Sequence, residues 1–530
     1  MDAIRFYDRA LQQLTRRQLL NAAATLGLGA IASPLVSSGV WAKPIFRNYP
    51  FTLGVASGDP LPDGVVLWTR LAPEPLNGGG MPTQAVEVNW EISTTANFAS
   101  PIAKGLTLAR PELGHSVHVE ATGLQPGREY FYRFIAGDEV SQIGRTKTAP
   151  ALGQMPDRMR YGVVGCNHYE NGHFTAYRHV ANERFDFIIH TGDYIYEGRG
   201  NGNRTPDLVV RQHEGDEIHT LVDYRNRYAQ YKMDPNLMAA HASAPWLVTR
   251  DDHEVENNYT GDADENNIPP EIFALRRAAA YQAYYETMPF RASVLPKGPS
   301  QIVYRRLRFG ELMDISLLDT RQYRSDQPCG DGSRTGCADI NKPNATMLGA
   351  EQEKWLFDNL GDIKARWTII SQQVPTFMRD SIKGAPEGQF SMDKWDAYVV
   401  ARQRLYERLK ETKAPNPVVL SGDVHLAYAS DLKMNYRDPR SETVGVEFTG
   451  TSISSAGDGT DVSATWEAIK GDNTHIKYHS AKRGYCGVTA TPTEMRADYM
   501  IVDKVTQPNM PVRTGASLVV PAGKPGLLNA

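Results

Sequence analysis

The chain of 530 residues is longer than a typical single domain and can bury a large apolar core. Its formal net charge of -4 and its 41% content of hydrophobic residues exclude the strongly basic surface of a nucleic-acid-binding protein and predict a globular chain. No segment beyond the N-terminal region approaches the roughly 18 consecutive apolar residues that a membrane-spanning helix needs. We therefore expect no stable nucleic-acid or membrane partner.

Residues 1–42 are predicted to be an export signal. Arg16 and Arg17 precede a weakly apolar stretch that ends in a cleavage site after Ala42. Paired arginines ahead of a mild apolar stretch resemble the twin-arginine signal, which delivers an already folded protein to its export machinery. The resemblance implies the twin-arginine export machinery as a partner, and a location in the periplasm or outside the cell. The alternative is an amphipathic helix that stays attached to the mature protein.

Residues 48–150 are predicted to form a β-sandwich domain. Apolar and polar residues alternate over 86–94, 115–124 and 128–137, and Gly, Pro and Asn separate these stretches. The stretch "LQPGREYFYRF" resembles the tyrosine corner of fibronectin-type domains. We expect this fibronectin-like domain to serve as a structural lid or spacer.

From residue 158 to residue 515, short apolar strands alternate with longer amphipathic stretches. Strands such as "FDFIIH" and "NPVVLS" are apolar on both faces, so helices must cover them. The pattern predicts an α/β (α+β) domain with at least one mixed β-sheet flanked by helices. We interpret the aromatic stretch 281–290 as helix packing in the core, and we expect the tail at 519–530 to be a loose terminus.

The four cysteines fall into three kinds of environment. Cys329 and Cys337 bracket the turn-rich loop "GDGSRTG" and are predicted to form a short disulfide in an oxidising compartment. Cys486 is expected to be a buried thiol. Cys166 differs from these because it directly follows the apolar strand "RYGVVG", which makes it a candidate for the functional site.

Polar side chains gather directly after four of the predicted strands. In open α/β sheets, ligands bind beyond the carboxyl ends of the strands. Desolvated carboxylates repel each other strongly unless a cation neutralises them, and the mixture of oxygen, nitrogen and sulfur donors suggests more than one metal ion. A single Gly-Asp after a strand would be weak evidence, because Asp is also a common helix cap. The residues are Cys166 and Asn167, then Asp193, Tyr194 and Tyr196, then Asp251, Asp252, His253, Glu254, Asn257 and Asn258, and finally Asp423 and His425.

The same motifs carry a family resemblance. Over residues 50–490 the chain resembles the metallophosphoesterases, and more closely the PhoD-type alkaline phosphatases. The resemblance rests on "GVASGDPLPDGVVLWTRL", "GDYIYEG", "DDHEVENNY", "LLDTRQYR" and "SGDVH". It implies a metallophosphoesterase-like β-sheet sandwich and a site similar to that of purple acid phosphatases, in which iron(III) (Fe3+) lies beside calcium (Ca2+).

The resemblance also implies a role for each candidate metal ligand. Asp193 would bridge the two metals. Iron would be bound by the Cys166 thiolate, the Tyr196 phenolate and the His425 imidazole, and calcium would be bound by Asp423. Asp252 and Asn257 are alternative calcium ligands from one loop. Glutamines at 372–373 stand where a nitrogen-rich site would offer His, which favours a hard ion; Mn2+ or Zn2+ in place of iron and calcium is a further alternative. The full ligand set is Cys166, Asp193, Tyr196, Asp252, Asn257, Asp423 and His425.

Hydrolysis of a phosphate ester needs an activated nucleophile and positive charge beside the phosphoryl oxygens. A metal cluster supplies both, because it lowers the pKa of a metal-bound oxygen nucleophile and contacts the phosphate. His253, next to Asp252, is predicted to protonate the leaving alkoxide, with Glu254 orienting its ring. The alternative is that His253 lies exposed at the start of a helix.

Arginines bind phosphate through paired donors. Arg250 lies beside the metal motif and is predicted to take part in catalysis with His253 and Asp252, while Arg321 and Arg324 are further candidates. Each arginine could instead belong to an ion pair. Asn167 could donate to a phosphate oxygen, and Asp319 could support the site from behind the ligands.

The predicted function is that of an exported metal-dependent phosphatase. It would hydrolyse small phosphomonoesters, and phosphodiesters as well, and release inorganic phosphate; the family resemblance alone implies an alkaline pH preference. A phosphodiesterase or phospholipase D-type enzyme on the same metal site is the nearest alternative, and a non-catalytic secreted binding protein is a more distant one. The long polar connection at 197–220 is either a lid or a solvated loop.

Overall fold

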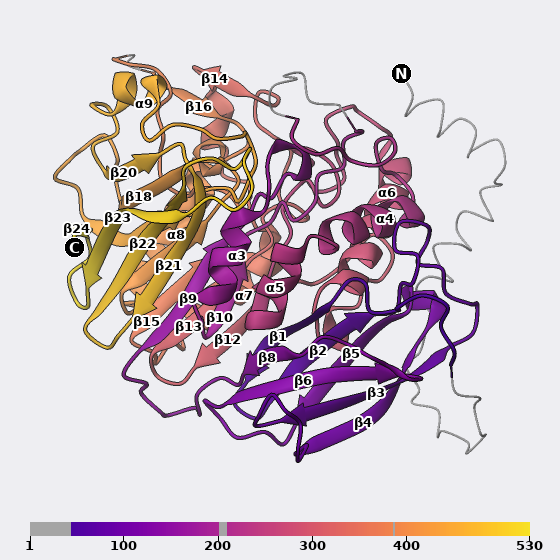
Figure 1. Ribbon diagram of the computed structural model, residues 1–530. Coiled ribbons are helices and arrows are strands. Elements are labelled where there is room, and N and C mark those ends of the chain that lie inside the picture. The colour runs from indigo at the N-terminus through magenta and orange to yellow at the C-terminus, as the bar shows by residue number, and fades with distance from the viewer. Residues whose placement is uncertain (1–43, 201–208, 385–386) are drawn as a thin grey trace.

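The computed structural model describes residues 44–200, 209–384 and 387–530 (Figure 1). The predicted signal at 1–42 lies outside the described residues, so its role stays a prediction. Of the connection at 197–220, predicted to be either a lid or a solvated loop, residues 201–208 also lie outside the described residues, so both alternatives stay open. Within the described ranges, no helix combines the length and the apolar character needed to cross a membrane.

A ten-stranded sheet runs through the molecule and carries the first three site motifs. At its centre β9, β10 and β11 are parallel to one another, and β21 pairs with β9 in the antiparallel direction. In spatial order the strands are β24 (Leu528–Asn529), β23 (Val512–Pro521), β22 (Glu494–Val502), β21 (Arg483–Ala490), β9 (Met159–Val164), β10 (Phe187–His190), β11 (Pro245–Val248), β1 (Val55–Leu61), β2 (Gly64–Arg70) and β5 (Ser116–Thr122).

A seven-stranded sheet packs face to face against the centre of the first. Alternation along β10 divides its side chains, since Phe187 and Ile189 lie in the core between the sheets and Ile188 lies on the other face. The ring of Phe187 stacks on that of Phe309 with 4.4 Å between centroids. The strand order is β12 (Arg305–Phe309), β13 (Met313–Leu317), β15 (Trp367–Ser371), β17 (Pro417–Ser421), β19 (Thr443–Thr449), β18 (Ala427–Lys433) and β20 (Ile476–Ser480).

Helices cover the outer face of each sheet, so the predicted helix-flanked β-sheet sandwich is confirmed. Residues of α3 (Thr175–Asn182), α4 (Leu221–Lys232), α5 (Pro235–Ser243) and α6 (Pro270–Thr287) pack on the ten-stranded sheet. Those of α7 (Gly349–Leu360), α8 (Val399–Glu411) and α9 (Ala464–Ile469) pack on the other. The aromatic stretch of α6 lies in the core as predicted, with Tyr281 and Tyr284 buried. Short 3-10 turns are η1 (Pro111–Leu113), η2 (Tyr169–Asn171), η4 (Ala292–Val294), η5 (Ala338–Asn341) and η6 (Trp395–Ala397).

The N-terminal β-region shares a sheet with the rest of the chain. Its own five strands, β3 (Val86–Ser93), β4 (Ala103–Ala109), β6 (Glu129–Ala136), β7 (Glu139–Val140) and β8 (Gly144–Lys147), form a separate sheet (Figure 1). That sheet packs on β1, β2 and β5, which extend the ten-stranded sheet through parallel pairing of β1 with β11. Tyr130 makes a tyrosine-corner contact, because its hydroxyl accepts a hydrogen bond from the backbone N–H of Gln125 at 2.8 Å.

The C-terminal tail is ordered, and the expectation of a loose terminus was wrong. The strand β23 runs from Val512 to Pro521 and pairs along its length with β22, so residue 515 is not a boundary of the structure. The strand β24 then adds the outermost pairing, Leu518 with Asn529. Apolar side chains at alternate positions of β23, Leu518 and Val520, reach the core between the sheets, which explains why the tail is held.

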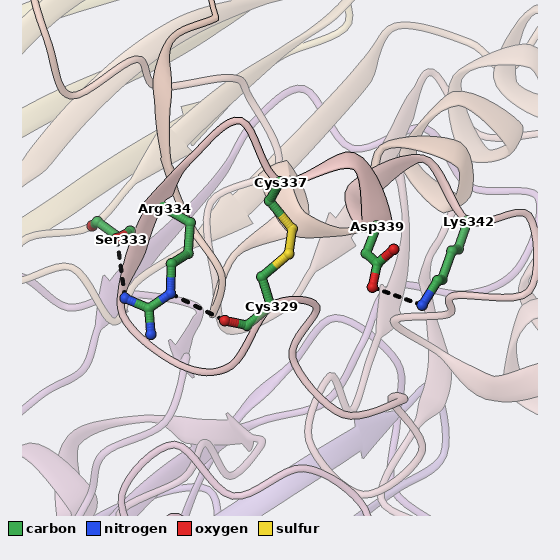
Figure 2. Close-up of a disulfide and its surroundings, with 6 residues drawn as sticks. All are labelled: Cys329, Ser333, Arg334, Cys337, Asp339 and Lys342. Atoms are coloured by element: carbon green, nitrogen blue, oxygen red, sulfur yellow. Dashed lines mark hydrogen bonds and ion pairs between the residues drawn. A yellow bond between two sulfur atoms is a disulfide. The ribbon is translucent and has the colours of Figure 1, made fainter.

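Cys329 and Cys337 form the predicted disulfide (Figure 2). Within the bridged loop, β14 (Ser333–Thr335) pairs with β16 (Gln389–Ser391), and Arg334 donates a hydrogen bond from Nε to the carbonyl oxygen of Cys329 at 3.1 Å. Asp331 in the same loop accepts from the side-chain amide of Asn258 at 2.7 Å. The bridge therefore holds a loop that contacts two segments next to the site motifs.

Replacing both bridged cysteines by serine is expected to lower stability. The bridge joins residues that are 8 positions apart in the sequence. Closing a loop of this size reduces the conformational entropy of the unfolded chain and so adds about 2–3 kcal/mol to the free energy of unfolding. The thermal unfolding midpoint of the double variant should therefore fall, while Ser333→Ala in the same exposed loop should leave it unchanged. An unchanged midpoint in the double variant would show that the bridge adds no stability.

Candidate metal centre

The polar motifs converge beyond the carboxyl ends of β9, β10, β11 and β17. Four of their residues adopt the left-handed backbone region, which non-glycine residues rarely visit and which turns each chain sharply as it leaves its strand. These are Cys166, Asp193, Asp423 and His425, with φ of 54°, 56°, 67° and 55°. Such conformations persist only where the surrounding structure holds them, and they are found most often at functional sites.

The glycine of each Gly-Asp motif allows close approach of neighbouring loops. A Cβ on Gly192 would lie 2.7 Å from the backbone nitrogen of Asp251, and one on Gly422 would lie 2.4 Å from Oγ1 of Thr191. Both distances are shorter than any real Cβ contact, so a side chain at either position would push the loops apart. The glycines thus bring the aspartates that follow them toward the centre of the site.

Three overlapping groups of ligand-type side chains form one cluster. Asp193 belongs to two of these groups and Asp252 to two, so the groups are continuous. Within each group the ligand atoms lie within 4.8 Å of one another. The groups are Cys166, Asp193 and His425; Asp193, Asp252 and His253; and Asp251, Asp252 and Asp423.

Tyr196 lies at the sulfur- and nitrogen-containing end of this cluster. Its hydroxyl donates to Oδ2 of Asp193 at 2.8 Å and lies 2.9 Å from Nε2 of His425. Oγ of Ser455 is 2.8 Å away and donates in turn to the carbonyl oxygen of Cys166. Of the seven predicted ligands, the structure therefore brings six together; Ser455 gave no signal in the sequence, because it follows no recognisable strand motif.

The predicted ligand Asn257 is directed elsewhere. Its side-chain amide donates to Glu265 at 2.7 Å, and its backbone N–H donates to Glu197 at 2.9 Å. Its neighbour Asn258 contacts the cluster instead, through a backbone N–H that donates to Oδ2 of Asp252 at 2.7 Å. The structure therefore places Asp252 in the ligand-type groups, whereas the side-chain amide of Asn257 is paired with Glu265.

Burial makes the cluster electrostatically costly without a cation. Burial, reinforced by the carboxylates of Asp252 and Asp423 and opposed by His253, raises the pKa of Asp193 to about 8. Burial and the Asp193 carboxylate raise the pKa of Cys166 and of Tyr196 well above their ordinary values. Positive charge beside Asp193, Cys166 and Tyr196 would therefore be needed to stabilise their ionised forms.

Unpartnered oxygens show that the residues fit cations. Oδ1 of Asp193, Oδ2 of Asp251 and Oδ1 of Asp252 are buried and find no hydrogen-bond partner in the described part of the chain. A buried ionised acceptor that receives no hydrogen bond costs about 1–3 kcal/mol, and among the described residues Oδ1 of Asp252 has only a nitrogen of Arg321 at 3.5 Å, so these oxygens fit a bound cation. The thiol, phenol and imidazole together suit a transition-metal ion, and the carboxylates of Asp251, Asp252 and Asp423 suit an ion that takes oxygen ligands alone.

His253 is oriented by Glu197, and the predicted role of Glu254 was wrong. Nδ1 of His253 lies 2.7 Å from Oε2 of Glu197, which leaves Nε2 as the atom that can exchange a proton. Glu254 instead accepts hydrogen bonds from the backbone N–H groups of Asp251 at 2.7 Å and Asp193 at 3.2 Å, and so ties the two loops together. Although burial opposes it, the Glu197 and Asp252 carboxylates raise the pKa of His253 well above its ordinary value.

Arg250 does not face the cluster, so its predicted catalytic role was wrong. Its guanidinium is fully buried, donates to Asp319 at 2.6 Å and to Oε1 of Gln301 at 2.7 Å, and lies over the ring of Tyr281. All of these partners lie outside the three ligand groups. Asp319 supports the site in the predicted way, because its Oδ1 accepts from the backbone N–H of Arg321 at 3.0 Å.

Arg321 lies inside the cluster as a counter-charge. Nε donates to Asp251, and the two terminal nitrogens lie 2.8 Å from Asp393, 3.0 Å from Asp423 and 3.5 Å from Asp252. Its side chain has no exposed surface, and each of its three nitrogens contacts at least one protein carboxylate. Arg324 is likewise buried and bonded to Asp393. Neither arginine is free to bind a phosphate as predicted.

Asn167 holds two strand ends together, and the expectation that it contacts phosphate was wrong. Its Nδ2 donates to the carbonyl oxygen of Tyr194 at 2.7 Å, and its Oδ1 lies 2.9 Å from Nε2 of His190 and accepts from Tyr177 at 3.0 Å. Both polar atoms of the amide are thus paired within the protein.

Sequence reasoning missed Asp393 and Lys394. They follow β16, a strand of 3 residues, so no apolar run marks their position. Lys394 lies 2.9 Å from Oδ2 of Asp393 and contacts Oδ2 of Asp423 directly. Although burial opposes it, Asp393 and Asp423 raise the pKa of Lys394 above its ordinary value, so it carries a positive charge.

The fold and the site together define an α/β sandwich enzyme with a cluster of potential metal ligands at the ends of its strands. Residues 161–499 match the family model of PhoD-like phosphatases, and residues 38–150 match that of the PhoD-like phosphatase N-terminal domain. The chain belongs to the PhoD-like phosphatase family, and the predicted family and enzyme class are confirmed.

Two relatives illustrate the similarity. Over 516 residues the chain is 48% identical to alkaline phosphatase D of Bacillus subtilis (strain 168), covering 97% of this chain and 88% of the relative. The solved structure of PhoD matches it with a TM-score of 0.90 at 48% identity, covering 92% of this chain and 93% of the solved one.

Glu197→Gln is expected to lower kcat for a phosphate monoester roughly 10–100-fold, since a correctly held general acid contributes about 10²–10⁴-fold. KM should change little, because Glu197 is not itself a member of the three ligand groups and acts through His253. The matched control is Glu265→Gln in the neighbouring loop, which should keep kcat near wild type. Wild-type kcat in Glu197→Gln would contradict the assigned pairing.

Proposed function

We propose that the chain is an exported, metal-dependent phosphatase that hydrolyses phosphomonoesters and phosphodiesters, with iron(III) and calcium as its metals. The observation that carries this proposal is the convergence of Asp193, Asp252 and Asp423 in one cluster, in which buried oxygens of Asp193 and Asp252 accept no hydrogen bond from the described residues. Small phosphate esters are the proposed substrates, and phosphodiester hydrolysis is proposed because the same residues suit both reactions.

The side chains divide into two proposed binding sets. Cys166, Tyr196 and His425 would hold iron(III), Asp251, Asp252 and Asp423 would hold calcium, and Asp193 lies between the sets. Bound metals would supply a polarised oxygen nucleophile and Lewis-acid contact to the phosphoryl oxygens. Asp251 was not among the predicted ligands; it enters through its unpartnered Oδ2.

The chain's own contribution to the reaction is proton transfer and orientation. Nε2 of His253 is the proposed donor to the leaving alkoxide, and Glu197 fixes the ring from the opposite nitrogen. The ring of Tyr196 lies against that of His253 with 4.1 Å between centroids, which restricts the imidazole further. Arg321 offsets part of the carboxylate charge and keeps the aspartates close together.

Export is proposed from two features. Residues 1–42 carry the paired arginines and the weakly apolar stretch of a twin-arginine signal, with the twin-arginine export machinery as partner. The Cys329–Cys337 bridge supports the same reading, because such bridges persist in the periplasm or outside the cell and are rare in the cytosol.

Asp193→Asn should abolish both metal binding and turnover. Loss of a bridging carboxylate removes the shared ligand of both sets, so kcat for a nitrophenyl monoester is expected to fall at least about 10³-fold, consistent with losing several kcal/mol of metal catalysis. Elemental analysis of protein matured in its own exporting cell should show the metals in wild type and in the exposed control Asp358→Asn. An Asp193→Asn variant with full metal content and activity would refute the proposal.

Purified protein is expected to be coloured if Tyr196 binds iron(III), because tyrosinate bound to iron(III) absorbs visible light by charge transfer. Tyr196→Phe should remove the absorption band. Tyr194→Phe is the matched control and should keep it, since the hydroxyl of Tyr194 contacts His241 in the core instead. A colourless wild-type enzyme with full activity would exclude the Tyr196–iron assignment.

A further inference from the structure

Lys394 lies at the edge of the carboxylate cluster and retains exposed surface. Its ammonium group is 2.9 Å from Oδ2 of Asp393 and contacts Oδ2 of Asp423, which belongs to the Asp251, Asp252 and Asp423 group. The side chain is 17% exposed, so an anion arriving at this group from solvent can reach it.

The other cations at these carboxylates are enclosed. In the described ranges, Arg321, Arg324 and Lys394 are the basic side chains that pair with Asp251, Asp252, Asp393 or Asp423. Both arginine side chains are 0% exposed. Lys394 is therefore the positively charged side chain of this set that a substrate can touch.

The position of Lys394 is fixed by its neighbours on both sides. The preceding residue, Asp393, is held by Arg321 at 2.8 Å. The following residue, Trp395, donates from its indole nitrogen to Oε1 of Gln372 at 3.1 Å. The backbone is thus anchored, while the four-carbon stem allows the ammonium to move between Asp423 and an anion beside it.

We propose that Lys394 binds the phosphoryl group of the substrate and makes the site prefer phosphomonoesters to phosphodiesters. This inference rests on the proposed function and adds its substrate preference. It differs from the sequence-based expectation, which assigned phosphate binding to Arg250, Arg321 or Arg324.

The physical basis of the preference is charge. A monoester carries two negative charges on its phosphoryl oxygens at alkaline pH, whereas a diester carries one. Coulomb attraction to a single ammonium therefore doubles for the monoester at equal distance. Lysine acts on phosphate as a compact point charge and, unlike arginine, does not need two parallel hydrogen bonds to the phosphoryl oxygens. The preference between the two esters therefore depends mainly on their charge.

The test compares kcat/KM for nitrophenyl phosphate and for methyl nitrophenyl phosphate. Lys394→Met is expected to lower the value for the monoester at least about tenfold more than the value for the diester, mainly through KM. Lys394→Arg should recover most of the monoester preference because it keeps the charge. Lys354→Met, on the exposed face of α7, is the control and should match wild type. Lys394→Gln provides a second neutral side chain in case the Met variant does not fold.

Two outcomes would overturn the inference. An unchanged ratio of the two kcat/KM values, with or without equal losses on both esters, would show that Lys394 acts only as a charge partner of Asp423. A fall in metal content by elemental analysis that accounts for the loss would have the same meaning. A wild-type protein that hydrolyses neither ester would instead refute the proposed function itself, so the two failures are distinguishable.

Discussion

Repulsion between buried carboxylates is the constraint on which the site depends. Asp193 and Asp252 lie in one ligand group and Asp251, Asp252 and Asp423 in another, and burial of Asp193, Asp251 and Asp252 removes water that would otherwise screen them. Arg321 and Lys394 neutralise part of this charge within the protein. The buried carboxylate oxygens that accept no hydrogen bond from the described residues mark the place where a bound cation would neutralise the remaining negative charge.

The two-sheet architecture is what brings these charges together. Parallel strands end at the same edge of a sheet, and packing of the two sheets places the end of β17 beside the ends of β9, β10 and β11. Gly192 and Gly422 then allow the loops to approach, and left-handed residues such as Asp193 aim their side chains inward. The apolar core between the sheets thus holds together carboxylates that would otherwise move apart because they repel each other.

Much of this arrangement could be predicted from the sequence, since apolar strands followed by polar residues identify both the sheets and their functional ends. Side-chain direction in the loops could not be predicted. Arg250 and Arg321 look alike as arginines next to acidic motifs, yet one turns into the core toward Asp319 and the other into the cluster. The partner of His253 was equally hidden, because Glu197 lies far from it in the chain and Glu254 lies beside it. Lys394 follows too short a strand to be noticed.

The strand order has a consequence for the timing of folding. β9, which ends two residues before Cys166, is enclosed by β10 on one side and by β21, near the C-terminus, on the other. β11 likewise receives β1 from the beginning of the chain. Such distant pairings are slow to form, and a growing chain cannot complete the middle of its main sheet until nearly all of it has left the ribosome. Assembly of the centre of the sheet is therefore expected late in folding, after the strands from both ends of the sheet are available.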